Sequence, residues 1–286
     1  MSEAAAACPY CGSEQARLEC KKHHWPGMTE AFFDVRHDLY VCEDCDLRFC
    51  HPLSDDLLDG IGNFFKTRYH ADRVNDLDRT LVNYWGTDIR SRLKRRLTYL
   101  RFLFRVTTGL GTLNRYEQVL KIVRQGRPRT LLDVGASHGL FLSMCLSAGM
   151  DGYGVEPSSE IVAALDAFNG GGRIAEGNFP ETRGKLPTYD VITFIAVMIC
   201  FAYPSRSFFA TCRQALNERG RLIIHDYNPA LASVDTLTHS VLGGPVWLSF
   251  YSPKFMQRVC RDVGFSSFEM FSDHLDGEKS IYVLTA

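Results

Sequence analysis

Short apolar runs alternate with amphipathic stretches along the second half of the chain. The runs at 131–134, 189–195 and 221–224 contain few polar residues, which is typical of strands buried on both faces of a parallel sheet. The stretches between the runs have the length and apolar spacing of helices, at Leu140–Ser147, Ser158–Phe168 and Ser205–Asn217. This regular strand–helix alternation predicts an α/β fold built on a parallel sheet.

The end of the chain has a different pattern. Ser267–Phe271 and Ile281–Thr285 flank a polar turn, and this arrangement predicts an antiparallel hairpin. Two further parallel strands are expected at 152–156 and 173–176. Five parallel strands would therefore precede the hairpin.

The first half of the chain contains strand formers and then a long helical pattern. Phe32–Val35 and Leu39–Val41 are rich in strand-forming residues. Beyond Ser54, Tyr84–Phe104 and Tyr116–Arg124 have apolar residues at helical spacing. We expect three parts, at residues 1–53, 54–126 and 127–286.

The polar residues after the first parallel strand suggest a binding site. Asp133 lies in that strand, and a turn bracketed by Gly135 and Gly139 leads into the next helix. Open α/β folds bind nucleoside ligands at the carboxyl ends of their strands. A dinucleotide site would have the spacing G-x-G-x-x-G around a diphosphate, which the carboxylate of Asp133 would repel. The pattern favours a nucleoside ligand with positive charge and no phosphate, such as S-adenosylmethionine, which has an ammonium and a sulfonium group.

An ordinary strand-to-helix turn would by itself explain the two glycines. Against this interpretation, Glu156-Pro157-Ser158 follows one strand–helix unit later, where a second strand ends in an acid. With these residues in place, Thr130–Ala286 resembles the class I S-adenosylmethionine-dependent methyltransferases.

That resemblance implies a Rossmann-like sheet of seven strands with a C-terminal antiparallel hairpin. It also implies that the backbone at Gly135 and Gly139 approaches the methionyl group, that Asp133 lies near its ammonium, and that Glu156 accepts hydrogen bonds from both ribose hydroxyls. The family often has Gly-Asp where this chain has Gly177-Asn178, so Asn178 or the Phe179 backbone would face the adenine. The product would be S-adenosylhomocysteine. The residues expected to bind the cofactor are Asp133, Gly135, Ser137, Gly139, Glu156, Pro157, Asn178 and Phe179.

Two C-x-x-C turns near the start of the chain predict a structural zinc site. Cys8 and Cys11 form the first turn, and Cys42 and Cys45 form the second. Four thiolates close a tetrahedral zinc site, and such a site leaves no position for catalysis. A redox dithiol would need only one C-x-x-C, and two disulfides are the remaining alternative. Other residues nearby that could replace one of the four ligands are Cys20, His23, His24, Cys50 and His51.

The segment around the second C-x-x-C turn, together with the order of the three parts, resembles a group of bacterial methyltransferases. These proteins have an N-terminal zinc ribbon, a helical linker or lid, and then the catalytic domain. The group often modifies sugars, polysaccharides or secondary metabolites. The resemblance therefore implies O- or C-methylation of a small-molecule or carbohydrate acceptor.

The residues that would contact the acceptor differ from the family pattern. Relatives commonly carry Leu-Glu-His after the fourth strand, whereas this chain has Met198-Ile199-Cys200-Phe201. The acceptor would then be held by apolar contacts or by polar groups from elsewhere. His225 and His239 are the candidate general bases, because imidazole accepts protons near neutral pH. Asp226 or Tyr227 would orient them, and residues 229–253 would face the acceptor.

The strongest concentration of positive charge is a predicted helix at 90–105. It is either a solvated face or a clamp for an anionic or nucleotide-linked acceptor, since arginine binds phosphate bidentately. An RNA acceptor is the alternative, but the net charge of −1 and the absence of an Asn-Pro-Pro-Tyr motif argue against it. A non-catalytic, cofactor-binding scaffold is a second alternative. The basic residues are Arg90, Arg92, Lys94, Arg95, Arg96, Arg101 and Arg105.

The cysteines and the apolar runs of the sequence indicate the cellular location of the protein. Four of the ten cysteines lie in C-x-x-C pairs and several others lie in apolar contexts, as expected of reduced thiols. No apolar run reaches the roughly 18–20 residues that span a bilayer, and the first residues lack the pattern of a signal peptide. We therefore expect a cytoplasmic protein without a membrane partner. The sequence does not indicate an oligomeric state.

Overall fold

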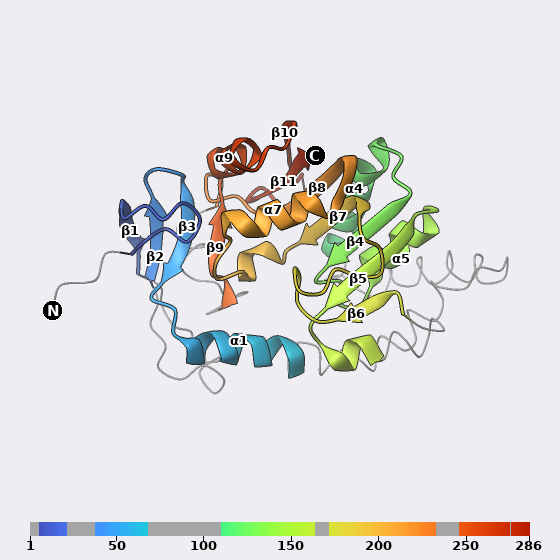
Figure 1. Ribbon diagram of the computed structural model, residues 1–286, viewed down its shortest axis with the longest axis horizontal. Helices are drawn as coiled ribbons and strands as arrows, with labels where there is room; N and C mark the ends of the chain where they lie inside the picture. The colour runs from blue at the N-terminus through green and yellow to red at the C-terminus, as the bar shows by residue number, and fades with distance from the viewer. Residues whose placement is uncertain (1–5, 22–37, 68–109, 164–171, 233–245, 275) are drawn as a thin grey trace. The chain divides into compact units, whose positions relative to one another are not determined.

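The computed structural model describes residues 6–21, 38–67, 110–163, 172–232, 246–274 and 276–286 (Figure 1). The chain forms two compact units. One comprises residues 1–64, 194–214 and 222–286, and the other comprises residues 65–193 and 215–221. The predicted helix at 90–105 and His239 lie outside the described residues.

The larger sheet has seven strands in the order β10-β11-β8-β7-β4-β5-β6. β4 pairs in parallel with β5, and β5 pairs in parallel with β6. This mostly parallel sheet confirms the predicted Rossmann-like α/β fold. The strands are β4 (Thr130–Val134), β5 (Asp151–Glu156), β6 (Ile174–Glu176), β7 (Tyr189–Ile195), β8 (Leu216–Tyr227), β10 (Ser267–Ser272) and β11 (Lys279–Thr285).

Burial explains why the central strands were recognisable. Leu131 and Leu132 of β4 are fully buried, and β7 is buried along most of its length. Helix α5 (Leu140–Ser147) packs against β5 (Figure 1). A Cβ at Gly152 would lie 2.6 Å from Leu142 Cδ1, so glycine allows the helix to approach the strand this closely. The close packing fixes where α5 begins relative to the end of β4.

The C-terminal hairpin is confirmed. β10 and β11 pair antiparallel, with Ser267 opposite Thr285 and Ser272 opposite Ser280. β11 is almost completely buried, whereas β10 has exposed residues along its length. The hairpin thus places an exposed strand at one edge of the sheet.

A second, four-stranded sheet has the order β1-β2-β3-β9. β1 (Ala16–Cys20), β2 (Asp38–Cys42) and β3 (Leu47–His51) form an antiparallel meander around the C-x-x-C turns. The fourth strand, β9 (Ser249–Tyr251), comes from about 200 residues later and pairs antiparallel with β3. This pairing was not predicted, because the sequence analysis placed residues 229–253 at the acceptor.

The remaining helices have identifiable starts and ends. Ser54 Oγ accepts from the Leu57 N–H at 3.2 Å and caps α1 (Asp55–Thr67). α4 (Leu110–Gln125) begins earlier than the predicted helix, and α7 (Arg206–Gln214) ends earlier. α9 (Pro253–Val263) was not predicted. No helix among the described residues is long and apolar enough to cross a membrane.

Candidate active site

The turn between β4 and α5 has an unusual backbone. Gly135, Ser137 and Gly139 have positive φ angles of 70°, 48° and 67°. The Gly135 N–H donates to Val155 O at 2.8 Å, so the turn is tied to the neighbouring strand β5. Glycine at 135 and 139 adopts these angles without the steric penalty of a Cβ. The turn also leaves the backbone open to close approach by a ligand.

Glu156, at the end of β5, holds this turn through its carboxylate. Oε2 accepts from the Ser137 N–H at 2.8 Å, and Oε1 accepts from the Ser158 N–H at 3.1 Å. The residue is 3% exposed. Burial raises the pKa of the Glu156 carboxyl, and the two backbone N–H groups oppose that rise. A carboxylate has about four acceptor positions, so it can accept from more than one donor at a time.

Asp133 is also 3% exposed, and its Oδ1 accepts from Thr193 Oγ1 of β7 at 2.7 Å. Burial raises the pKa of the Asp133 carboxyl to about 7, although the Thr193 hydroxyl opposes the rise, and the charge of Glu156 adds to it. A cation beside Asp133 would favour its ionised form. Its position is therefore compatible with the predicted contact to an ammonium group.

The third part of the predicted cofactor site follows β6. The Gly177 N–H donates to Glu156 O at 3.1 Å, which places 177–179 next to the end of β5. Asn178 is exposed, and Phe179 is buried. The structure thus gathers the predicted cofactor residues at the carboxyl ends of β4, β5 and β6. Their roles toward the cofactor stay predictions.

His225 does not lie at the edge of a cleft, where the sequence analysis expected it. The side chain is 0% exposed, and its Nε2 lies 2.8 Å from Oδ2 of Asp273, which is also 0% exposed. Asp273 follows β10, 48 residues along the chain, and no sequence signal pointed to this pair. Asp226 accepts from the Tyr227 and Ile199 N–H groups instead of orienting His225. The predicted catalytic role of His225 would need a movement that exposes the ring.

The residues after β7, which we call the acceptor turn (Met198–Phe201), begin with a short 3-10 helix at Met198–Cys200. Met198 and Ile199 are buried, and Cys200 is half-buried. The side chains at the positions of the usual Glu-His pair are therefore those of Ile199 and Cys200. They provide apolar and thiol surface and no carboxylate or imidazole.

The four cysteines of the C-x-x-C turns form a compact cluster. All four Sγ atoms lie within 4.8 Å of one another, with Cys8 and Cys45 3.5 Å apart and Cys11 and Cys42 3.6 Å apart. Disulfide sulfurs would be about 2.05 Å apart. Ligands at 2.3 Å from a tetrahedral zinc ion are roughly 3.8 Å apart, so the cluster fits such an ion.

The alternative ligands near the cluster have other positions. Cys50 donates to Trp247 O at 3.4 Å, and Cys20 lies in β1 outside the four-cysteine group. His51 contacts the Tyr40 ring edge-on. His23 and His24 lie outside the described residues. Among the described residues, the group that could hold a metal ion therefore consists of the four predicted cysteines.

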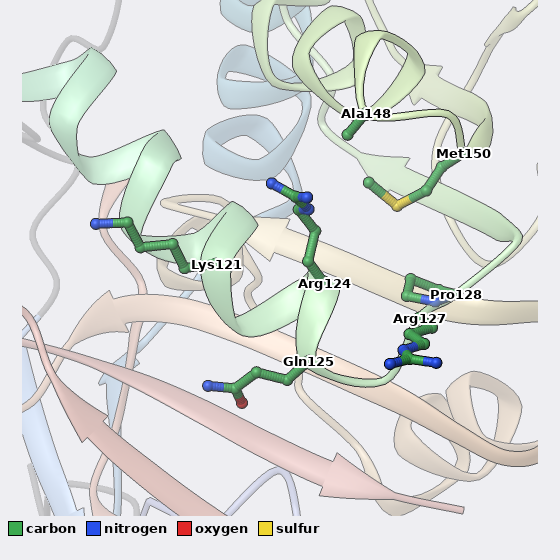
Figure 2. A pocket seen from close by; sticks show the side chains of 7 residues that line it. All are labelled: Lys121, Arg124, Gln125, Arg127, Pro128, Ala148 and Met150. Carbon is green, nitrogen blue, oxygen red and sulfur yellow. The ribbon is translucent and has the colours of Figure 1, made fainter.

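A hollow of about 570 Å³ is lined by seven residues, three of which are basic. Figure 2 shows their side chains. Arg127 and Pro128 lie just before β4, and Met150 lies just before β5, so the hollow is at the amino ends of these strands. Cofactors of open α/β folds bind at the opposite, carboxyl ends. We therefore do not assign this hollow to the cofactor. Its lining residues are Lys121, Arg124, Gln125, Arg127, Pro128, Ala148 and Met150.

Comparison with known proteins agrees with the fold. A family model described as a methyltransferase domain matches residues 81–269, and the chain belongs to this family as an S-adenosylmethionine-dependent methyltransferase. No curated protein sequence matches the chain.

Several solved structures have a similar fold. A protein described as a candidate O-methyltransferase from Nostoc punctiforme has a TM-score of 0.51 and 17% identity, over 79% of this chain and 72% of its own. The PH0226 protein from Pyrococcus horikoshii has a TM-score of 0.50 and 13% identity, over 63% of this chain and 92% of its own. A SAM-dependent methyltransferase from Archaeoglobus fulgidus has a TM-score of 0.48 and 14% identity, over 60% and 94%. At such identities the likeness shows the fold alone.

Replacing Glu156 with Ala should weaken S-adenosylhomocysteine binding. The substitution removes the acceptor for two backbone N–H groups and for the ribose hydroxyls, and we expect a loss of about 1–3 kcal/mol. Isothermal titration calorimetry measures this loss. The control is Glu160→Ala, which removes an exposed acid just after the same strand. Equal affinities for the two variants would show that the ribose lies elsewhere.

Cofactor affinity should rise with pH up to about 7. The free protein holds a proton on Asp133 below this pH, and a cationic ligand releases that proton, so affinity should fall by up to tenfold per pH unit below 7. S-adenosylhomocysteine titrations between pH 5.5 and 7.5 test this expectation. Asp133→Asn should remove the dependence, and methylthioadenosine, which lacks the ammonium, should not show it. A similar dependence for both ligands would contradict the placement of the ammonium.

Proposed function

We propose that the protein transfers the methyl group of S-adenosylmethionine to oxygen or carbon of a small-molecule or carbohydrate acceptor. The observation that carries the proposal is the pair of buried carboxylates, Asp133 and Glu156, at the carboxyl ends of β4 and β5. They suit a ligand with an ammonium and two hydroxyls, and they oppose a phosphate. The cofactor supplies an electrophilic methyl group on its sulfonium.

The protein's own residues provide positioning and exclusion of water. Glu156 fixes Ser137 and the ribose side of the site before the ligand binds, so no reorganisation is needed there. The acceptor turn offers partly exposed side chains at Cys200 and Phe201, whereas Met198 and Ile199 are buried. Methyl transfer is an in-line displacement, and orientation of two reactants contributes roughly 7–11 kcal/mol. An apolar acceptor surface is sufficient for such a mechanism.

Removal of the acceptor's proton is the second requirement. In our proposal His225 takes this proton after a movement that exposes its ring, and Asp273 holds the ring through Nε2. His239 is the alternative base. We propose that the acceptor is a small molecule of a biosynthetic pathway, a class that includes anionic and nucleotide-linked compounds. We also propose that the reaction takes place in the cytoplasm.

Labelled methyl transfer tests the proposed activity. The protein is incubated with methyl-tritiated S-adenosylmethionine and either a desalted low-mass cell extract or bulk RNA. We expect label in the low-mass fraction, and Glu156→Ala should reduce the rate because it weakens cofactor binding. Label that accumulates in RNA would overturn the proposed acceptor class.

Two other outcomes distinguish the alternatives. The basic side chains of Lys121, Arg124 and Arg127 around the hollow are the observation that favours RNA, and binding to RNA would then weaken steeply with salt. A protein that binds S-adenosylhomocysteine but labels neither fraction would be the non-catalytic scaffold. The absence of cofactor binding would contradict both the enzyme and that scaffold.

We also propose that Cys8, Cys11, Cys42 and Cys45 hold one structural zinc ion. Each turn is closed by a backbone hydrogen bond between residues four positions apart. The Gly12 N–H donates to Cys8 O, and the Asp46 N–H donates to Cys42 O. These bonds hold both pairs of thiols toward one centre. Zinc at such sites contributes on the order of 10 kcal/mol to folding.

Cys42→Ser should lose the metal and lower the thermal midpoint of unfolding. Elemental analysis of the purified protein should give one zinc per wild-type chain and a strongly reduced content in the variant. Cys20→Ser is the matched control, because Cys20 lies in the same sheet but outside the cluster. A metal-free wild-type protein with an unchanged midpoint would refute the zinc site.

A further inference from the structure

The acceptor turn is held by hydrogen bonds from two segments of the chain. Asp226 Oδ2 accepts from the Ile199 N–H at 2.9 Å. Tyr251 Oη donates to Met198 O at 2.7 Å, and the Leu248 N–H donates to Ile199 O at 2.7 Å. Ser249 Oγ donates to Phe201 O at 2.8 Å. Three of these four bonds come from residues 248–251.

Residues 249–251 of this segment are β9, the fourth strand of the four-stranded sheet near the C-x-x-C turns. Leu47 pairs with Tyr251, Arg48 with Phe250 and Phe49 with Ser249. The Cys50 N–H donates to Leu248 O at 2.8 Å. The backbone of β9 therefore belongs to the ribbon. The side chains of Ser249 and Tyr251, together with the N–H group of Leu248 just before β9, hold the acceptor turn.

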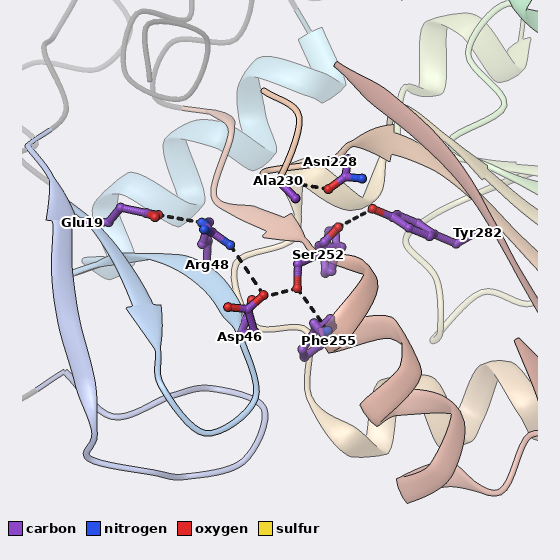
Figure 3. A network of polar contacts seen from close by, with 9 residues as sticks. Glu19, Asp46, Arg48, Asn228, Ala230, Ser252, Phe255 and Tyr282 are labelled. Carbon is purple, nitrogen blue, oxygen red and sulfur yellow. Dashed lines mark hydrogen bonds and ion pairs between the residues drawn. The ribbon is translucent and has the colours of Figure 1, made fainter. Parts of the chain in front are cut away.

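A further contact joins Ser252, the residue after β9, to Asp46, the residue after the second C-x-x-C turn. Ser252 Oγ donates to Asp46 O at 3.3 Å and accepts from the Phe255 N–H at 3.1 Å (Figure 3). Arg48 Nε lies 2.7 Å from Glu19 Oε2, and its Nη1 lies 3.8 Å from Asp46 Oδ2 (Figure 3). Asp46 follows Cys45 directly, so a short path of bonds joins the cysteine cluster to β9.

Because these side chains are buried, water cannot easily replace their hydrogen-bond partners. Tyr251, Ser249 and Asp226 are at most 1% exposed. Burial and the charge of Asp226 raise the pKa of the Tyr251 hydroxyl well above its usual value, so it remains a donor at neutral pH. Tyr282 Oη donates to Tyr251 O at 2.6 Å and fixes the strand from the β11 side (Figure 3).

We infer that the cysteine ribbon, acting through β9, sets the position of the acceptor turn, and that Tyr251 and Asp226 are positioning residues for the methyl acceptor. The inference rests on the proposed function, because it assigns the turn to the acceptor. The cofactor residues Asp133, Ser137 and Glu156 make none of these bonds. A displacement of about 1 Å at a reacting group costs roughly a hundredfold in rate, so loosening the turn should impair transfer and leave cofactor binding intact.

Tyr251→Phe tests the inference because it removes one hydroxyl and retains the ring. We expect faster hydrogen–deuterium exchange at the Ile199 amide and a ten- to hundredfold slower transfer of label to the low-mass extract at saturating S-adenosylmethionine. The dissociation constant of S-adenosylhomocysteine should change by less than twofold. Asp226→Asn should likewise increase exchange at Ile199.

The matched control is Tyr189→Phe. Tyr189 is also fully buried, and its hydroxyl donates to Arg183 O at 3.0 Å, away from the acceptor turn. It should lower the thermal midpoint about as much as Tyr251→Phe but leave exchange at Ile199 and the transfer rate unchanged. Equal effects of the two variants on transfer would overturn the positioning role.

Chelation of the wild-type protein tests the part played by the ribbon. Removal of zinc should increase exchange at residues 47–50 and at Ile199, while the amides of 131–134 stay protected. Slow exchange at Ile199 in the metal-free protein, or loss of protection at all of these positions together, would overturn the inference. Absence of label transfer by the wild-type protein would instead count against the proposed function, and the exchange results would still decide the coupling.

Discussion

The two hydrogen bonds that the Glu156 carboxylate accepts from the backbone fix the shape of the cofactor side of the site. They join the glycine turn after β4 to the end of β5, and the turn needs this restraint because Ser137 has a positive φ. A non-glycine residue in this conformation is disfavoured unless its surroundings hold it there. The protein therefore pays the cost of ordering the turn during folding and not during binding.

Burial of Asp133 beside Glu156 has the opposite effect on stability. Two carboxyls with raised pKa values share the interior at the end of the sheet. The free protein therefore loses stability as the pH rises from 3.8, the ordinary pKa of Asp133, to its raised pKa of about 7. A cationic ligand reverses this effect because it stabilises the ionised form. The same residues that weaken the free protein thus favour the bound state.

Much of the fold could be predicted because its signals are local. β7 and α5 have the predicted bounds, since a mostly apolar run and a glycine before the helix mark their limits. Asp133 and Glu156 were identifiable from their places near the ends of strands. Their hydrogen-bond partners were not, because Glu156 accepts from backbone N–H groups, which leave no trace in a sequence, and Asp133 accepts from the hydroxyl of Thr193, 60 residues away.

The features that could not be predicted depend on distant pairs. The partner of His225 is Asp273, 48 residues away, and neither residue carries a pattern that points to the other. β9 has three residues, too few for a periodic signal, and it forms a strand only because β3 offers an open edge. The acceptor turn was located by its departure from the family pattern, but its four hydrogen bonds required the structure.

The pairing of β3 with β9 also constrains the order of events in folding. β3 can pair with β9 only after residue 251 has been synthesised. Contacts between residues so far apart in the chain form slowly. Until then, the N–H and C=O groups along one edge of β3 are open to other strands, which is a common route to aggregation. The ribbon lies near the start of the chain, but its fourth strand is synthesised late in translation. The ribbon is therefore one of the last parts of the protein that can be completed.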